Sequence, residues 1–323
     1  MGTVSAASEP RDTMNKITSR IDAITGIPLA YRHEYLPAPK SCKIEITANC
    51  NYKCRFCVRT LREQDGEMDR ALYSRLIREL RTAGVEELGL FYIGESFTLK
   101  WLPQAIKEAK DVGFPYVFLT TNGSASTPSR VRDCMEAGLD SLKFSLNFPD
   151  AKQLAEVAQV GEQYWQRAVN NLKAAFTVRQ DGKFTCGLYA SSIAFDGEQG
   201  QKMKALVEEI RPFVDEHYWL PLYGMSGASK AAGMKPGAGN PGRLDKMRDP
   251  LPCWAVFTEA HITVDGLLAA CCFGSGIEGD LIMADLNKVS FTTGWNSEAY
   301  RALRKAHLNK NVTGTACESC VAG

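Results

Sequence analysis

No segment of this sequence approaches the ~20 consecutive apolar residues that a helix needs to cross a bilayer. Residues 1–11 have no basic stretch followed by an apolar core, so they do not predict a secretory signal. Neither sign of charge is in excess, because 38 Lys and Arg stand against 37 Asp and Glu, and no Lys or Arg run occurs. These absences argue against a membrane or a nucleic acid as the main partner.

Histidine is scarce, and its four copies form no nucleophile dyad and no metal-binding trio. Cysteine is therefore the residue type that predicts chemistry. Eleven cysteines in a chain without a secretory signal indicate metal or redox chemistry in a reducing cytoplasm rather than disulfides. Seven of them fall into two groups, Cys50/Cys54/Cys57 and Cys253/Cys271/Cys317/Cys320, and the other four are Cys42, Cys134, Cys186 and Cys272.

Strand-like and helix-like segments alternate over residues 41–222, and each of the first five strands is followed by a helix. This alternation predicts an α/β fold in which a parallel sheet carries helices on its outer face, with the reactive loops at the C-terminal ends of the strands. The expected strands are Lys43–Thr47, Glu86–Ile93, Tyr116–Thr120, Ser141–Leu146, Lys183–Ser191 and Glu216–Leu220, and the expected helices are Asp69–Ala83, Leu99–Val112, Thr127–Ala137, Ala151–Arg179 and Glu198–Phe213.

Three further segments flank this region. Residues 14–36 predict a helical segment, within a partly disordered extension over 1–40, that covers the bottom or the side of the main domain. Residues 223–250 are rich in Gly, Pro, Ser and Ala, which fits either a linker or a functional lid. Residues 251–323 predict a smaller unit, with a hairpin around Asp265-Gly266 and a helix over Ser297–Leu308.

The first cysteine group directly follows a predicted strand. Three thiolates within eight residues, Cys50, Cys54 and Cys57, suit three irons of a cubane cluster and leave the fourth iron free to chelate a small molecule. Zinc is the alternative, but it usually takes four ligands, and no His follows nearby. A strand followed by Cys-x3-Cys-x2-Cys, with Phe56 before the last Cys, resembles the radical S-adenosylmethionine (radical SAM) superfamily.

The resemblance implies a three-quarter (β/α)6 version of the eight-fold barrel. It also implies that SAM binds the open iron and is cleaved by one electron to methionine and a 5′-deoxyadenosyl radical, which removes a hydrogen atom from the substrate. Flavodoxin or ferredoxin would supply the electron. Tyr52 and Phe56, beside the cluster ligands, are then expected to contact the cofactor.

Further SAM contacts are expected at the ends of the following strands. Gly94-Glu95-Ser96 resembles the Gly-Gly-Glu-Pro motif of the family, although Ile93 replaces the first Gly and Ser96 the Pro. Asn122 lies in a matching element after the third strand, where Asn-Gly is also simply a tight turn. Polar residues that close a strand are the alternative for each of these positions. The expected contacts on the fourth and fifth strands are Ser145, Asn147 and Ser191, with Tyr189 facing SAM or substrate.

The second cysteine group is C-terminal. Cys253, Cys271 and the pair Cys317-x2-Cys320, with Gly266 before Cys271, resemble a shortened SPASM domain, called a twitch domain. The resemblance implies one auxiliary [4Fe–4S] cluster held by four cysteines, which conducts electrons and has no open iron. A zinc site with four cysteine ligands is the alternative on chemistry alone.

The reaction depends on the fate of the substrate radical. Cys272, or alternatively Cys186 or Cys42, could return a hydrogen atom as an epimerase requires, although a free Cys is most often a small buried hydrophobe. Twitch enzymes include a 2-deoxy-scyllo-inosamine dehydrogenase and sugar epimerases. We therefore expect an oxidoreductase or epimerase that acts on a small sugar, aminocyclitol or similar molecule in natural-product or cell-surface biosynthesis.

Two other functions remain open. Modification of a ribosomally made peptide is disfavoured because only about forty residues precede the first strand, too few for a winged-helix peptide-binding module. A non-catalytic iron–sulfur carrier would leave Gly94, Glu95, Ser145 and Asn147 without a purpose.

Overall fold

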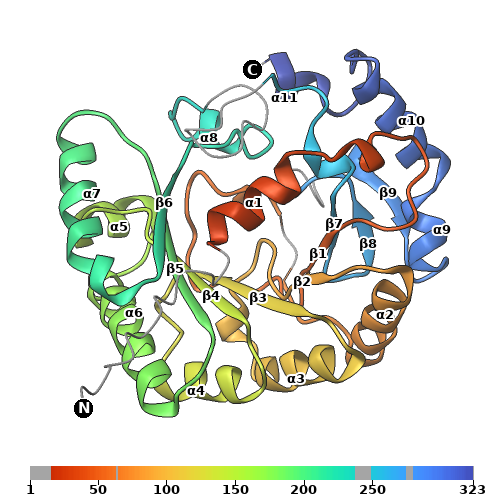
Figure 1. Ribbon diagram of the computed structural model, residues 1–323. Coiled ribbons are helices and arrows are strands. Elements are labelled where there is room, and N and C mark those ends of the chain that lie inside the picture. Colours follow the sequence, from red (N-terminus) through yellow and green to blue (C-terminus); the bar gives the residue numbers. More distant parts are fainter. Residues whose placement is uncertain (1–15, 63–64, 237–248, 274–278, 323) are drawn as a thin grey trace, which may run out of the picture.

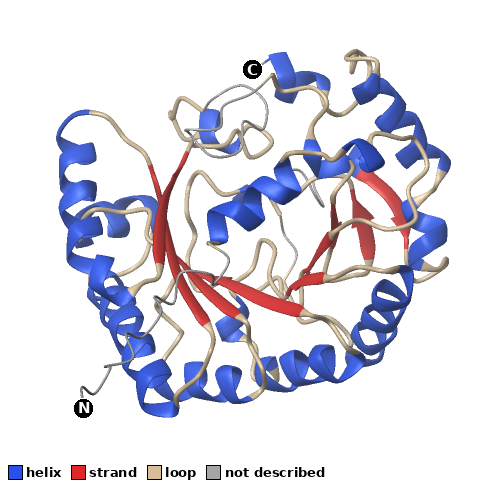
Figure 2. Cartoon of the chain, in the orientation of Figure 1, coloured by secondary structure: helices blue, strands red, loops and turns tan. Residues whose placement is uncertain are grey.

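The computed structural model describes residues 16–62, 65–236, 249–273 and 279–322. A single curved sheet of nine strands, in the order β6-β5-β4-β3-β2-β1-β7-β8-β9, surrounds a central space, and most helices lie outside it (Figures 1 and 2). The predicted α/β fold with an open, partial barrel is confirmed. The strands are β1 (Ser41–Ile44), β2 (Glu87–Gly89), β3 (Tyr116–Thr121), β4 (Ser141–Ser145), β5 (Gly187–Ile193), β6 (Glu216–Leu220), β7 (Glu259–Ile262), β8 (Leu267–Ala269) and β9 (Ile282–Asp285).

Local sequence signals explain why the outer helices form. In α2 (Arg70–Ala83), Asp69 caps the N-terminus by accepting a hydrogen bond from the Leu72 N–H at 2.8 Å, and Gly84 ends the helix in the left-handed conformation. No helix of the described residues is long and apolar enough to cross a membrane. The other α-helices are α1 (Ile17–Thr25), α3 (Leu102–Val112), α4 (Pro128–Glu136), α5 (Ala151–Ala158), α6 (Gln163–Gly182), α7 (Gly197–Ile210), α8 (Ala228–Ala231), α9 (Phe291–Trp295), α10 (Glu298–Leu308) and α11 (Glu318–Ala322).

Several predicted boundaries differ from the structure. The first strand is Ser41–Ile44 instead of the expected Lys43–Thr47, and α1, within the helical segment expected over 14–36, ends at Thr25. The helix expected over Ala151–Arg179 is two helices, because Gln159 adopts the left-handed conformation and ends α5. The following strand begins at Gly187, four residues later than predicted, because α6 continues to Gly182. The second strand is shorter than predicted, since its ladder with β1 and β3 ends at Gly89.

The C-terminal hairpin belongs to the barrel sheet. β7 pairs in parallel with β1, from Ser41 opposite Glu259 to Ile44 opposite Ile262. β8 and β9 then continue the sheet in antiparallel fashion. The sequence predicts the hairpin and the Ser297–Leu308 helix but not this pairing. The predicted division at 41–222, 223–250 and 251–323 stays a prediction, and 237–248 of its middle segment lie outside the described residues.

Helix α1 covers the N-terminal end of the barrel, as the sequence predicts (Figure 1). Arg20 forms an ion pair with Glu87 at 2.6 Å, and its guanidinium lies 3.4 Å from the centre of the Tyr116 ring. The hydroxyl of Thr18 donates to Glu216. Glu87, Tyr116 and Glu216 are the first residues of β2, β3 and β6, so α1 closes the bottom of the space inside the sheet.

Candidate active site

The loop that carries the first three cysteines is held at both ends and in the middle. Arg62, which follows the loop, donates from both terminal guanidinium nitrogens to the fully buried Glu45 carboxylate, at 3.0 and 3.2 Å. In the middle, the Lys53 N–H donates to the Ala158 carbonyl, at the end of α5. A bidentate ion pair that is buried from solvent fixes the orientation of Arg62 and its distance from Glu45. The cysteine loop therefore has a defined place above β1.

The three thiols of this loop lie within electrostatic reach of one another. Burial and the neighbouring groups raise the pKa of Cys50 to about 12, and burial also raises the pKa values of Cys54 and Cys57. Thiols in such a setting become thiolates when a metal replaces their protons. Three ligands and one open iron fit a SAM-binding [4Fe–4S] cluster, so the donor set agrees with the sequence prediction.

A second cavity, of about 320 Å³, is lined by all four C-terminal cysteines, Cys253, Cys271, Cys317 and Cys320. Burial raises the pKa of Cys253 to about 12. Among the described residues, no three His, Cys, Asp or Glu side chains gather as a single metal ion requires. A lone zinc needs thiolates within ~4 Å of each other, since its Zn–S bonds measure about 2.3 Å. Four cysteines around one cavity suit either a fully ligated [4Fe–4S] cluster or a zinc ion on chemistry alone.

The predicted motif after β2 packs directly against the cysteine loop. A Cβ on Gly94 would lie 2.1 Å from the Thr47 carbonyl oxygen, so only glycine fits this approach. The Glu95 carboxylate is buried and accepts hydrogen bonds from the Thr121 hydroxyl at 2.8 Å and the Asn122 N–H at 2.7 Å. Ser96 donates to the Leu90 carbonyl at 2.6 Å. The motif therefore joins the ends of β1, β2 and β3.

The other predicted cofactor residues lie along the same edge. The Asn122 side chain donates to Asn51 of the cysteine loop at 2.9 Å. Ser145 and Ser191 are cross-strand neighbours on β4 and β5, and the fully buried Ser191 hydroxyl has no hydrogen-bond partner among the described residues. Asn147, just beyond β4, is half-buried. Asn122, Ser145 and Asn147 lie at or just beyond the ends of β3 and β4, and Ser191 lies two residues before the end of β5.

The two aromatics of the cysteine loop pack against α6 and the connection between β4 and α5. The Tyr52 ring meets the Tyr164 ring edge-on at 6.0 Å, and the Phe56 ring lies 6.2 Å from that of Phe148. Neither lines the barrel cavity among the described residues. Both support the loop, and a contact with the cofactor stays a prediction.

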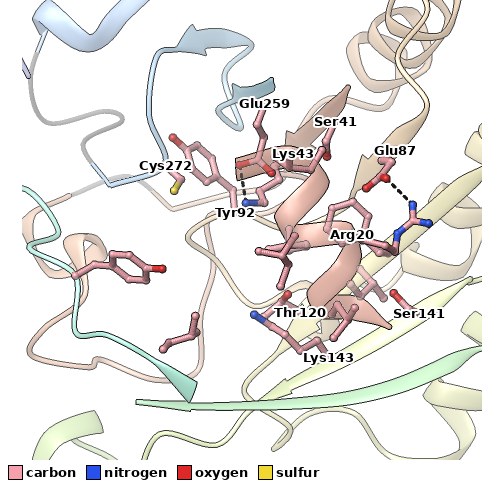
Figure 3. Close-up of a pocket in the computed structure, with 18 of the residues that line it drawn as sticks. Arg20, Ser41, Lys43, Glu87, Tyr92, Thr120, Ser141, Lys143, Glu259 and Cys272 are labelled. Atoms are coloured by element: carbon pink, nitrogen blue, oxygen red, sulfur yellow. Dashed lines mark hydrogen bonds and ion pairs between the residues drawn. The ribbon is translucent and has the colours of Figure 1, made fainter. Parts of the chain in front are cut away.

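The barrel itself holds a cavity of about 320 Å³ that runs from α1 toward the cysteine loop (Figure 3). Lys43 of β1 forms an ion pair with Glu259 of β7 at 2.8 Å, and Glu259 contacts the His261 ring nitrogen at the same distance. Burial alone would raise the pKa of Glu259, but Lys43 and His261 lower it to about 2. Tyr92 stacks on His261 with ring centres 5.5 Å apart. The carboxylate is thus ionised and fixed inside the barrel.

Sequence reasoning missed this network. Lys43 and Glu259 are far apart in the chain and meet only because β7 pairs with β1. The only local signal is Lys43, a charged side chain within a predicted strand, which occurs in many exposed strands as well.

The three predicted catalytic residues occupy different places. Cys272 lines the barrel cavity and lies in the turn after β8 (Figure 3). Cys186 is buried near Cys134 and Arg179, away from the cavity. Tyr189 is buried near Tyr116 and Glu216, at the bottom of the barrel. Of the three, the structure brings only Cys272 to the cavity.

A barrel with a three-thiol loop at its C-terminal edge, beside a cavity with four cysteines, defines an iron–sulfur enzyme with two distinct cluster sites. Family comparison agrees. The model described as the radical SAM superfamily matches residues 44–209, just over half of the chain. A second, described as an iron-sulfur cluster-binding domain (SPASM), matches residues 253–321. The chain belongs to the radical SAM superfamily, whose cofactors are SAM and a [4Fe–4S] cluster, and its SPASM domain implies auxiliary iron–sulfur binding.

Individual proteins match this chain over shorter regions or at lower sequence identity. A GTP 3′,8-cyclase of Synechococcus sp. (strain CC9902) is 34% identical over 119 residues, which cover 36% of this chain and 34% of the cyclase. The chain thus spans about a third of the length of that curated relative. Streptococcus suis SuiB bound to the precursor peptide SuiA has a similar fold, with a TM-score of 0.65 at 14% identity over 93% of this chain and 75% of SuiB. BtrN in complex with AdoMet and 2-DOIA has a TM-score of 0.54 at 16% identity, over 83% and 86%.

Proposed function

We propose that this protein is a radical SAM oxidoreductase that dehydrogenates a small polar molecule, such as a sugar or an aminocyclitol. The adjacency of the two cavities carries the proposal. Cys271 lines the cavity of the four cysteines, and the next residue, Cys272, lines the barrel cavity. Met225 and Phe273 line both. Oxidation of an alcohol to a ketone removes a hydrogen atom, a proton and an electron, and an electron-acceptor site next to the substrate suits this outcome.

Each cofactor has its residues in this proposal. When bound, SAM and its cluster supply the 5′-deoxyadenosyl radical that takes the hydrogen atom. Cys50, Cys54 and Cys57 would hold that cluster, and the second cysteine group an auxiliary [4Fe–4S] cluster. Gly94 lets the loop after β2 approach the cysteine loop. The buried Glu95 carboxylate holds the loop after β2 on the end of β3. The residues proposed to contact SAM are Tyr52, Phe56, Gly94, Glu95, Ser96, Asn122, Ser145, Asn147 and Ser191.

Epimerisation is the second outcome that the site supports. Cys272 lines the barrel cavity, where its thiol could return a hydrogen atom to the opposite face of a substrate radical. The thiol would then be restored by one electron and one proton. Cys186 and Tyr189 lie outside the cavity lining and are weaker candidates for this role.

Peptide modification remains the alternative function, because the SuiB structure that resembles this chain holds a precursor peptide. The cavity volume of about 320 Å³ suits a small molecule or one peptide side chain. We also propose flavodoxin or ferredoxin as the electron donor. We propose the cytoplasm as the compartment, because thiolate-held iron–sulfur clusters and unpaired cysteines persist under reducing conditions.

The test uses protein reconstituted anaerobically with iron and sulfide. Dithionite and SAM are added with a panel of sugars, cyclitols and peptides, and 5′-deoxyadenosine and the substrate product are quantified. We expect about eight irons per chain and 5′-deoxyadenosine formation stimulated by a sugar or cyclitol. A ketone product supports dehydrogenation, and an inverted centre supports epimerisation. Stimulation by peptides alone would refute the small-molecule proposal, and absence of SAM cleavage would refute catalysis altogether.

A further inference from the structure

The barrel cavity contains one more positive than negative side chain. Its charged lining consists of Arg20, Lys43 and Lys143 on one side and Glu87 and Glu259 on the other. Arg20 pairs with Glu87 at 2.6 Å, and Lys43 pairs with Glu259 at 2.8 Å (Figure 3). Among the described residues Lys143 forms no ion pair, because the carboxylate whose charge reaches it, Glu259, is already paired with Lys43.

The surroundings of Lys143 make the lack of an ion-pair partner unusual. Its ammonium nitrogen lies 5.8 Å from the centre of the Tyr218 ring, and no described residue forms an ion pair or hydrogen bond with it. Burial and the positive charge of Lys43 lower the pKa of Lys143 to about 8. Buried charges in proteins are normally paired, because an isolated one is costly to desolvate. A lysine that borders a cavity without a partner indicates a ligand group of opposite charge.

The position of Lys143 separates it from the proposed SAM contacts. It lies beside Thr120 of β3 and precedes Ser145 by two residues on the same face of β4. Two strand residues correspond to about 7 Å, so Lys143 lies one layer deeper in the barrel than Ser145 and Ser191. The cluster loop lies above that layer, which leaves the level of Lys143 for the substrate.

We propose that the substrate is an anion whose carboxylate or phosphate group binds to Lys143 in the barrel cavity, beside the Lys43–Glu259 pair. This inference rests on the proposed function and narrows its substrate class. Lys43 contributes long-range attraction, and its ion pair with Glu259 stays intact. A neutral sugar or cyclitol would leave Lys143 unpaired, whereas an acidic sugar, a sugar phosphate or a nucleotide would supply the missing charge.

Matched neutral and anionic compounds provide the first test. Holoenzyme with SAM and dithionite is incubated with glucose, glucuronate or glucose 6-phosphate, and with myo-inositol or its monophosphate. We expect only the anionic members to stimulate 5′-deoxyadenosine formation, and the preferred one distinguishes carboxylate from phosphate. Equal stimulation by a neutral member would overturn the proposal. SAM cleavage without substrate is measured in parallel, so failure of the radical SAM function itself is recognised separately.

Substitutions of Lys143 provide the second test, with Lys204→Met on the exposed face of α7 as the control. Lys143→Met should raise the half-saturating concentration of the stimulating anion at least tenfold, and leave SAM affinity and substrate-free SAM cleavage within twofold. Lys143→Arg keeps the charge and should retain most of the stimulation. If Lys143→Met weakens SAM binding equally, Lys143 serves SAM instead. If Lys143→Arg is as inactive as Lys143→Met, its role is proton transfer. Either result overturns the proposal.

A direct binding measurement decides the matter if no compound of the panel stimulates the enzyme. Inorganic phosphate and acetate are titrated calorimetrically into the SAM-loaded holoenzyme. We expect one of them to bind to the wild type and the Lys204→Met control, and at least tenfold more weakly to Lys143→Met. Absence of binding to the wild type, or equal binding to Lys143→Met, would overturn the proposal.

Discussion

At two positions of this site the residue type is constrained by packing as well as by side-chain chemistry. One constraint is the close approach of two backbone segments, and the other is burial of a charged group. Gly94 shows the first constraint, because two backbone segments meet at its Cα. Glu95 shows the second, since three donors surround its carboxylate oxygens and leave it no freedom to rotate. Both residues belong to a motif that resembles a SAM-binding element, yet their contacts in this structure also hold the site together.

Gly94→Ala should destabilise the protein and weaken SAM binding together. The new Cβ would lie 2.1 Å from the Thr47 carbonyl, and neither partner is a flexible side chain, so the backbone must shift. We expect a loss of about 3 kcal/mol in unfolding free energy, measured by urea denaturation, with a matching fall in SAM affinity. Gly279→Ala is the control, because its Cβ would meet nothing within 4 Å. Equal stability of both variants would contradict the packing argument.

His217 should make stability depend on pH. Burial, aided by the positive charge of Arg211, lowers the pKa of His217 to about 4, below its ordinary 6.5. The fold therefore prefers the neutral ring, so this contribution is complete above pH 6.5 and is lost as the pH falls toward 4. Between pH 7.5 and 5.5 we expect a loss on the order of 1 kcal/mol, measured by urea unfolding of the anaerobic holoenzyme.

His217→Gln should reduce this pH dependence, whereas His33→Gln, at an exposed position, should not. His307 is also buried and has its pKa lowered to about 4, so a residual slope of the same sign is expected. An unchanged slope in His217→Gln would contradict the assignment.

At the scale of elements, the site depends on segments that close the barrel at its two ends. The cysteine loop lies at the C-terminal edge, held by the Arg62–Glu45 pair and by the end of α5. Helix α1 closes the opposite end through Arg20, which contacts both Glu87 and Tyr116. The cavity between them is therefore lined partly by residues remote from the cofactor sites, among them Arg20 and Glu87.

Arg20→Ala should loosen α1 without unfolding the barrel. The variant loses an ion pair and a cation–π contact that are together worth about 1–2 kcal/mol in a partly buried setting. Amide hydrogens of Ile17–Thr25 should exchange several-fold faster, as measured by mass spectrometry, while those of β3 and β4 stay protected. Arg301→Ala, exposed on α10, is the control. Unchanged exchange in α1 would show that its apolar side chains alone hold it in place.

At the scale of the whole molecule, the two cysteine groups are joined by one sheet. Four residue pairs connect β1, which leads into the cysteine loop, with β7, which leads to Cys271 and Cys272. The Lys43–Glu259 ion pair crosses the same junction. The distance between the two cluster sites is therefore set by β-pairing rather than by a linker.

Truncation and cysteine substitution should have different consequences. A chain that ends at residue 250 loses β7 and exposes the β1 edge, so we expect aggregation or loss of cooperative unfolding. The double substitution Cys317→Ala/Cys320→Ala keeps the sheet, and should lose about four of eight irons while remaining folded. Iron analysis, gel filtration and circular dichroism check both. A stable monomeric truncated chain would contradict the structural role of the β1–β7 pairing.

The sequence alone predicts a large part of this protein because its signals are local. Cysteine spacing requires ligands within a few residues of one another, and the alternation of strand and helix follows from periodicity. The ladder of six parallel strands therefore agrees with prediction. Boundaries such as the start of β5 differ, because helix extension through Gly182 depends on packing as well as on local preference.

Only the tertiary structure decides which distant residues meet. The β1–β7 pairing places Lys43 beside Glu259 and His261, more than two hundred residues away in the chain. Because Glu259 pairs with Lys43, Lys143 has no ion-pair partner of its own among the described residues. The β1–β7 pairing also places Cys271 and Cys272 after β8, where the two residues line different cavities. Sequence patterns record which groups are available, whereas the charge balance of a cavity depends on which strands are neighbours, and that is a property of the folded sheet.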